Sequence, residues 1–222
     1  MIFLDRAEAG RELLKRLAAY ANRRDVLVLA IPRGGVPVAF EVALGLRAPI
    51  DIFTVRKLGV PGREELAFGA IASGGHRFLD TEIVEAVGIS DLEIERITAR
   101  ENLELERREH LYRSGLPPLA LEGRTVILTD DGIATGSSVQ VAITALRQRN
   151  PSRIVVAVPV APASTCRRLR KEVDDLVCVQ MPDSFYAIGE FYQDFSQVSD
   201  ETVTSLLRDA SREFAKCVAN TG

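Results

Sequence analysis

Short apolar runs alternate with stretches of helical periodicity along this chain, and that alternation limits the possible folds more than any other feature. The predicted strands cover residues 26–31, 51–55, 125–129, 154–160 and 176–179. Several are apolar throughout, as parallel strands covered on both faces are. The predicted helices cover residues 5–21, 140–149, 163–173 and 201–216, with another beginning near 37. This order predicts an α/β fold: a single domain with a central, mainly parallel sheet flanked by helices.

The composition is consistent with one such domain and narrows the classes of function. The chain has 222 residues, of which 46% are hydrophobic, and its formal net charge is −3. Because no global basic field exists, we expect no nucleic-acid partner. The apolar runs fall short of the roughly 20 residues that span a bilayer, so we expect no membrane partner. Three cysteines without a Cys-x-x-Cys pair, and no secretory signal pattern, predict a cytoplasmic protein.

Residues 90–113 interrupt the alternation with twelve charged side chains. Ser90 and Glu93 have the spacing of a capping box, which marks the start of a helix. Oppositely charged side chains four positions apart would support that helix on its exposed face. We predict a charged helical insertion around residues 80–120, solvated and flanking the core. A helical contact between subunits is the alternative.

The loop after the predicted strand 125–129 carries the most chemical information. Two adjacent carboxylates, Asp130 and Asp131, precede a run of small and hydroxyl-bearing residues that leads into a helix: Gly132, Ile133, Ala134, Thr135, Gly136, Ser137 and Ser138. Backbone N–H groups, hydroxyls and the positive end of the helix suit a phosphate monoester. The carboxylates repel each other, and ribose hydroxyls or a nearby Mg²⁺ would stabilise them. An ordinary Asp-Gly turn is the alternative.

This segment resembles the loop that binds phosphoribosyl pyrophosphate (PRPP) in the type I phosphoribosyltransferases. In that resemblance Asp130 and Asp131 match the acidic pair, and residues 134–138 match the loop for the 5-phosphate. The wider pattern extends from about residue 26 to residue 198. It implies PRPP and a nitrogenous acceptor as substrates, Mg²⁺ as cofactor with Asp130 and Asp131 as its indirect ligands, and a homodimer.

Two further loops follow predicted strands at the places where this family has functional loops. Arg33, Gly34 and Gly35 follow the first strand and match the pyrophosphate loop, with one cation and a close backbone approach. Arg56 and Lys57 begin a basic segment, 56–65, that is similar to the flexible catalytic loop; a solvated surface turn is the alternative. The resemblance therefore implies these catalytic residues: Arg33, Arg56, Lys57, Asp130 and Asp131.

An aromatic-rich segment near the C-terminus is the candidate acceptor site. Residues 180–198 resemble the hood of the hypoxanthine-guanine enzymes, and Phe185 or Tyr186 would stack on the base. Core packing is the alternative for such a cluster. Ala134 replaces the carboxylate that six-oxopurine enzymes carry, and residues 158–162 lack the lysine that reads the base oxygen. The sequence therefore favours no single base.

Three classes of function remain open at this point. The first is a Mg²⁺-dependent phosphoribosyltransferase that moves the 5-phosphoribosyl group from PRPP to a nitrogenous base or similar acceptor and releases pyrophosphate. The second is a non-catalytic regulator that senses PRPP or a nucleotide on the same fold. The third is an interaction module. The first two predict PRPP binding, and only the first predicts turnover.

Overall fold

The computed structural model describes residues 1–114 and 119–219, apart from the side chains of residues 64, 65 and 218. Its central sheet has five parallel strands in the order β2-β1-β6-β7-β8. These strands are β1 (Val26–Ala30), β2 (Ile50–Ile52), β6 (Thr125–Thr129), β7 (Arg153–Val160) and β8 (Asp175–Gln180). The predicted α/β class and the mainly parallel sheet are confirmed.

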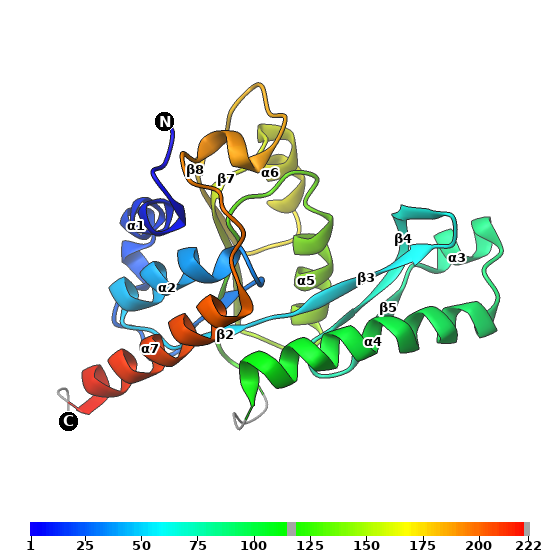
Figure 1. The fold of residues 1–222 in the computed structure, drawn as a ribbon, viewed down its shortest axis with the longest axis horizontal. Coiled ribbons are helices and arrows are strands. Elements are labelled where there is room, and N and C mark those ends of the chain that lie inside the picture. The colour runs from blue at the N-terminus through cyan, green and yellow to red at the C-terminus, as the bar shows by residue number, and fades with distance from the viewer. Residues whose placement is uncertain (115–118, 220–222) are drawn as a thin grey trace.

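Helices cover both faces of this sheet (Figure 1). One face carries α1 (Arg6–Arg16), α2 (Gly35–Leu46) and α7 (Asp200–Ala219); the other carries α5 (Ser137–Arg147) and α6 (Ala163–Leu169). Successive residues of a strand point to opposite faces, so Val26 and Val28 pack with the first group and Leu27 and Leu29 with the second. The apolar strands are therefore buried on both sides. Short 3-10 helices, η1 (Ala18–Tyr20) and η2 (Ile188–Phe191), complete this body.

A second, antiparallel sheet extends away from the central one (Figure 1). It consists of β3 (Val55–Val60), β4 (Arg63–Ala72) and β5 (His76–Leu79), followed by α3 (Thr81–Val87) and α4 (Asp91–Arg113). We call residues 55–113 the arm. Its own small core joins Leu58 and Phe68 of the sheet to Ile94 and Ile97 of α4.

The arm corrects one prediction and confirms another. Residues 56–65 are not a loop, because β3 pairs with β4 in an antiparallel hairpin that turns near Gly62. Leu58 and Val60 are buried, and the intervening glycine and cations hid this alternation in the sequence. The helix beginning after Ser90 is confirmed, since the Ser90 side chain accepts the Glu93 N–H. Residues 115–118 of the predicted 80–120 insertion, like 220–222, lie outside the described residues.

The predicted strands and helices otherwise differ from the observed ones mainly at their ends. The last helix begins one residue before the predicted start at 201 and continues three residues past the predicted end at 216. The predicted helix 163–173 already ends at Leu169. Among the residues that the structure describes, no helix is long and apolar enough to cross a membrane.

Candidate active site

The acidic pair lies directly after β6, and the loop that follows β1 packs against it. A Cβ atom added at Gly34 would lie 2.1 Å from the Oδ2 atom of Asp131. One added at Gly35 would lie 2.7 Å from the carbonyl oxygen of Thr129. Both positions therefore require glycine for this close approach. The structure thus brings together the two loops that the sequence assigned to the acidic pair and to pyrophosphate.

The charged forms of the two carboxyl groups are disfavoured, because the surrounding protein excludes much of the solvent. Burial, followed by the neighbouring charge of Asp131, raises the pKa of Asp130 well above its ordinary value. Burial also raises the pKa of Asp131, although the Arg6 guanidinium acts in the opposite direction. The carboxylate of Asp130 accepts the backbone N–H of Asp131 at 2.9 Å. A bound cation or hydroxyl donors would stabilise the charged forms of this pair.

Arg6 is a site residue that the sequence patterns did not reveal. Asp5 caps α1 by accepting the N–H of Glu8, so Arg6 is the first residue of that helix. Its Nε atom donates to Oδ2 of Asp131 at 2.9 Å, and its Nη1 atom donates to the carbonyl oxygen of Ser196 at 2.8 Å. None of the loops that resemble the family contains Arg6. The only signal was its place directly after a helix cap.

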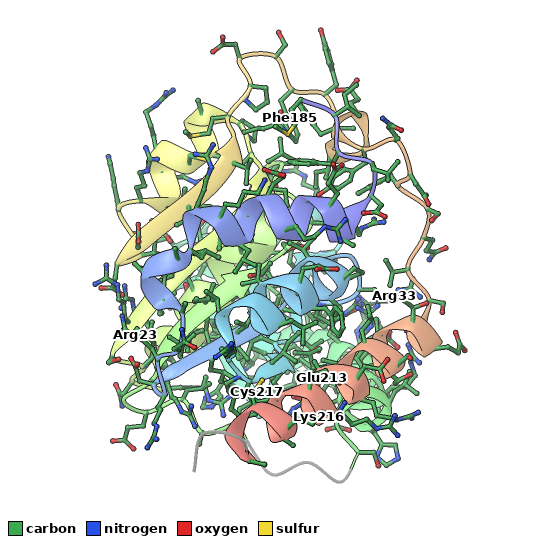
Figure 2. The ribbon with its side chains drawn as sticks, turned by 90° about the vertical axis from the view of Figure 1, so that its left-hand side faces the viewer. Arg23, Arg33, Phe185, Glu213, Lys216 and Cys217 are labelled. Atoms are coloured by element: carbon green, nitrogen blue, oxygen red, sulfur yellow. The ribbon has the colours of Figure 1, made fainter. Side chains whose placement is uncertain are left out.

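The segment 180–198 contacts the site through aromatic residues other than the two predicted ones. The Tyr192 hydroxyl donates to the backbone carbonyl of Asp131 at 2.5 Å, and the Arg6 guanidinium lies 4.0 Å from the ring centre of Phe195. Phe185 instead stacks on Phe191, and Tyr186 is 86% exposed. Figure 2 shows Phe185 well separated from Arg33. The residues predicted for base stacking are therefore not those nearest the acidic pair.

The predicted phosphate loop is a compact turn that leads into α5. Gly136 has a φ of +79° and precedes the first residue of the helix, Ser137. The Thr135 and Ser137 hydroxyl oxygens lie 3.1 Å apart. The Thr165 hydroxyl of α6 donates to the carbonyl of Ala134 at 2.9 Å, which ties the loop to that helix. Ala134, Thr135 and Ser138 are exposed, so this surface is open to a ligand.

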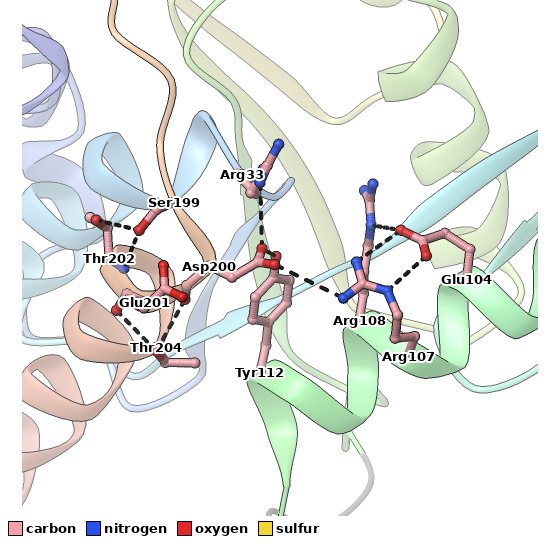
Figure 3. Close-up of polar contacts among 10 residues, drawn as sticks. All are labelled: Arg33, Glu104, Arg107, Arg108, Tyr112, Ser199, Asp200, Glu201, Thr202 and Thr204. Atoms are coloured by element: carbon pink, nitrogen blue, oxygen red, sulfur yellow. Dashed lines mark hydrogen bonds and ion pairs between the residues drawn. The ribbon is translucent and has the colours of Figure 1, made fainter.

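The three predicted cations lie in two different surroundings. Arg33 forms a long ion pair of 3.7 Å with Asp200, which also binds the Tyr112 hydroxyl (Figure 3). Arg56 lies on β3, and its Nε atom donates to Glu101 of α4 at 2.9 Å. Lys57 follows it on β3, and no ion pair of Lys57 is found among the described side chains, which leave out those of residues 64 and 65. Only Arg33 is placed next to the acidic pair.

A cavity of about 360 Å³ opens beside the acidic pair. It is lined by Arg6, Arg33, Gly34, Asp131, Phe195, Gln197 and Val198. Its walls therefore come from α1, from the loop after β1, from the loop after β6 and from the segment before α7. In parallel α/β sheets, ligands bind beyond the carboxyl ends of the strands, where this cavity lies. Neither Arg56 nor Lys57 belongs to this lining.

Comparison with known proteins identifies the class to which this fold and site belong. Residues 3–196 match the model of the phosphoribosyl transferase domain, so the chain belongs to the phosphoribosyl transferase family. The predicted resemblance to the phosphoribosyltransferases is thereby confirmed.

Two relatives are similar over nearly the whole chain. A protein of Mycobacterium tuberculosis named as a phosphoribosyl transferase, found in strains H37Rv and CDC 1551, is 41% identical over 218 residues. That match covers 98% of this chain and 49% of the relative, so the chain spans about half the length of its curated relatives. The crystal structure of TT1426 from Thermus thermophilus is 40% identical, with a TM-score of 0.84. This match covers 94% of the present chain and 99% of the chain of TT1426.

Proposed function

We propose that this chain transfers the 5-phosphoribosyl group from PRPP to a nitrogenous acceptor and releases pyrophosphate. The observation that carries the proposal is the close approach of the glycine loop, residues 33–35, to the acidic pair. A Cβ atom added at Gly34 would lie only 2.1 Å from the Oδ2 atom of Asp131. This contact joins a candidate pyrophosphate loop to a candidate ribose site, with the phosphate loop following in the same turn. Membership of the phosphoribosyl transferase family supports the same assignment.

The proposed reaction breaks the bond from the anomeric carbon to pyrophosphate and forms a bond from that carbon to the acceptor nitrogen. A proton carried by that nitrogen is released to the solvent or to the departing pyrophosphate. Positive charge develops on the ribose ring and negative charge on the leaving pyrophosphate. Asp130 and Asp131 would accept hydrogen bonds from the ribose hydroxyls, and residues 134–138 would bind the 5-phosphate. Arg33 would stabilise the leaving group, joined by Arg56 and Lys57 if the β3–β4 hairpin approaches the substrate.

Mg²⁺ is part of the proposal, and the residues fit a metal that is held mainly by the substrate. No group of three or more His, Cys, Asp or Glu side chains within the described part of the chain could hold a metal ion. Mg²⁺ usually needs only one or two carboxylates when substrate phosphates complete its coordination. Asp130 and Asp131, with raised pKa values, have the charge and the crowding that a cation would relieve. When bound, the metal would neutralise charge on the pyrophosphate.

A sensor that binds PRPP without turnover is the second candidate, and specific contacts favour it. Arg56 is tied to Glu101 on α4, and Asp131 is paired with Arg6. In this arrangement part of the catalytic set is engaged with the protein itself. An interaction module on this fold, the third class, predicts no response to PRPP.

The proposal is tested by ligand binding and turnover on the same preparation. We expect PRPP with Mg²⁺ to raise the melting temperature, because a ligand that binds only the folded state stabilises it. With a panel of nitrogenous acceptors, pyrophosphate should be released. Binding without turnover across a broad panel would favour the sensor. No thermal response to PRPP would contradict both.

The Asp131→Asn variant tests the acidic pair itself. It keeps the shape of the side chain and removes the charge that would strengthen the bond from a ribose hydroxyl. We expect PRPP affinity to fall by about 10- to 100-fold, the range for one hydrogen bond to a charged group. Asp209→Asn makes the same change on the exposed part of α7 and should leave affinity unaltered. Equal PRPP affinity in both variants would exclude Asp131 from the site.

A further inference from the structure

The cavity beside Asp131 combines two cations with apolar surface. Arg6 and Arg33 contribute two positive charges to its lining, and Asp131 contributes one negative charge. Phe195 and Val198 provide the apolar part of the wall. Its volume of about 360 Å³ is suited to a small molecule rather than to a macromolecule. Such a lining favours a ligand that has both a flat apolar body and a negative charge.

Arg6 has hydrogen-bonding capacity that the protein does not use. A guanidinium has five N–H donors. Within the described residues, Arg6 makes two hydrogen bonds, through Nε to Asp131 and through Nη1 to the carbonyl of Ser196. Only 11% of the Arg6 side chain is exposed, so solvent has little access to the remaining donors. A ligand in the cavity can therefore accept bonds from a cation that is already fixed in place.

Substrate binding would change the charge balance around Arg6. In the proposed function, the ribose hydroxyls donate to the carboxylate of Asp131, which is the ionic partner of Arg6. The carboxylate is then shared between the ribose and the guanidinium. A partly buried guanidinium with a weakened counter-charge is unfavourable. An acceptor that brings its own negative charge would restore the balance, whereas a neutral acceptor would not.

The two arginines have different positions and therefore different tasks. Arg33 belongs to the glycine loop, and its ion pair with Asp200 is long, at 3.7 Å. It is therefore available for the leaving pyrophosphate. Arg6 is held by residues near the other end of the chain: it donates to the Ser196 carbonyl, and its guanidinium lies 4.0 Å from the ring centre of Phe195. A guanidinium fixed in this way presents a planar fork, which matches a planar carboxylate.

We infer that the acceptor of this chain is a heteroaromatic carboxylate, and that Arg6 binds its carboxylate group. The inference rests on the proposed function and names the substrate class of the same site. The ring of such an acceptor would pack on Phe195 and Val198. Its carboxylate would accept hydrogen bonds from the N–H groups of Arg6 that the protein does not use. Phe185 and Tyr186 have no part in this arrangement.

The test compares matched acceptors that differ in one carboxylate. The probes are orotate against uracil, and pyridine-3-carboxylate against pyridine-3-carboxamide. Initial rates of pyrophosphate release at saturating PRPP and Mg²⁺ give kcat/KM for each probe, and a thermal shift gives PRPP affinity separately. We expect at least one carboxylate to exceed its neutral partner by about tenfold or more, the value of one hydrogen bond between charged groups.

Variants of Arg6 then separate acceptor binding from an effect through Asp131. Arg6→Gln should abolish the preference for the carboxylate, and Arg6→Lys, which keeps the charge, should retain part of it. Arg11→Gln removes an exposed arginine of the same helix and should leave the preference intact. An equal loss of PRPP affinity and of acceptor kcat/KM in Arg6→Gln would overturn the inference.

Two further outcomes decide between the inference and the function on which it rests. If PRPP binds but no carboxylate is preferred over its neutral partner, the inference is wrong while the proposal of PRPP binding stands. Absence of turnover with every carboxylate probe has the same meaning. If PRPP with Mg²⁺ produces no thermal shift, the proposed function itself is contradicted, and the inference is overturned with it.

Discussion

The carboxylate of Asp131 is held from two sides by parts of the chain that are far apart in sequence. Arg6 at the start of α1 donates to it at 2.9 Å, and the backbone at Gly34 approaches it so closely that no side chain fits between them. Its backbone carbonyl is fixed by the Tyr192 hydroxyl at 2.5 Å. Each contact limits a different freedom of the residue, so the carboxylate has one preferred position.

Gly34→Ala should therefore displace either the carboxylate of Asp131 or the loop after β1. The added Cβ would lie 2.1 Å from the Asp131 Oδ2 atom, far inside van der Waals contact. We expect a loss of about 1–3 kcal/mol in the free energy of unfolding, as for other overpacked positions. PRPP affinity should fall as well. Urea unfolding and a PRPP thermal shift measure the two effects.

Gly88→Ala is the matched control for that variant. Gly88 has a φ of +73°, and an added Cβ there would meet no heavy atom within 4 Å. The substitution is strained only by its backbone conformation. Stability should therefore decrease without any change in PRPP affinity. If Gly34→Ala also left PRPP affinity unchanged, the glycine loop would have no role in the site.

At the scale of elements, α4 connects the arm to the central body. In the middle of α4, the Glu101 carboxylate accepts a hydrogen bond from Arg56 of β3. At its end, the Tyr112 hydroxyl donates to Asp200 at the start of α7. Arg113 donates to Asp51 of β2 at 2.9 Å. Because Asp200 also faces Arg33, this helix is connected to the candidate active site through the Asp200 carboxylate (Figure 3).

Asp200→Asn should strengthen anion binding by Arg33. The substitution keeps a hydrogen-bond acceptor for Tyr112 but removes the negative charge 3.7 Å from the Arg33 guanidinium. We expect affinity for pyrophosphate to rise by up to about fivefold, since exposed ion pairs are worth little. The gain should shrink at high salt. Calorimetric titrations at two salt concentrations, with Asp209→Asn as control, measure it; weaker binding in Asp200→Asn would contradict this role.

Glu104 should make α4 sensitive to acid. Hydrogen bonds from Arg107 and then Arg108 lower the pKa of Glu104 from 4.5 to about 2. The folded state therefore binds fewer protons than the unfolded chain between these pH values. The stabilisation is complete above about pH 4.5 and is lost as the pH falls towards about 2.

The Glu104→Gln variant measures that contribution. It should be less stable than the parent chain at neutral pH, and the difference should fade across the acidic range, as followed by urea unfolding. Glu106→Gln, an exposed position on the same helix, controls for the substitution type. A stability difference that stays constant with pH would show that the ion pairs contribute nothing.

For the whole molecule, the arm is the feature that extends away from the central body (Figure 1). The central body has a core on each face of its sheet, and the arm has a separate core between its own sheet and α4. Several large apolar side chains of the arm remain exposed: Leu66, Leu79, Val87, Leu92, Leu103 and Leu111. Exposed apolar side chains of this kind favour the alternative for the charged helix, a contact between subunits, over a purely solvated face.

The homodimer stays a prediction, as does the cytoplasmic location. We expect sedimentation velocity to give twice the chain mass of 24.3 kDa at micromolar concentration. Leu92 is 80% exposed, and Leu92→Glu would place a charge on the arm that a buried contact could not accommodate. The variant should therefore shift the population towards monomer. Sedimentation of the parent chain at 24.3 kDa would contradict the dimer.

The parallel sheet and the order of its loops could be predicted because they depend on local patterns. Apolar runs with β-branched residues mark buried strands, and the acidic pair followed by small residues marks an anion loop. The hairpin 55–72 was missed because Gly59, Pro61 and Gly62 resemble a loop locally. Its strands are held by contacts with α4, which begins only at Asp91, well beyond the hairpin in the sequence.

By itself, the sequence determined the α/β class, the loops that face the site and the family that they resemble. Only the tertiary structure decided which aromatic ring and which arginine reach the acidic pair. Phe195 and Arg6 are brought there by packing between the two ends of the chain, where the Phe3 N–H donates to the Phe191 carbonyl. Such long-range contacts leave no periodic signal in the sequence, because they depend on the free energy of the whole fold rather than on local spacing.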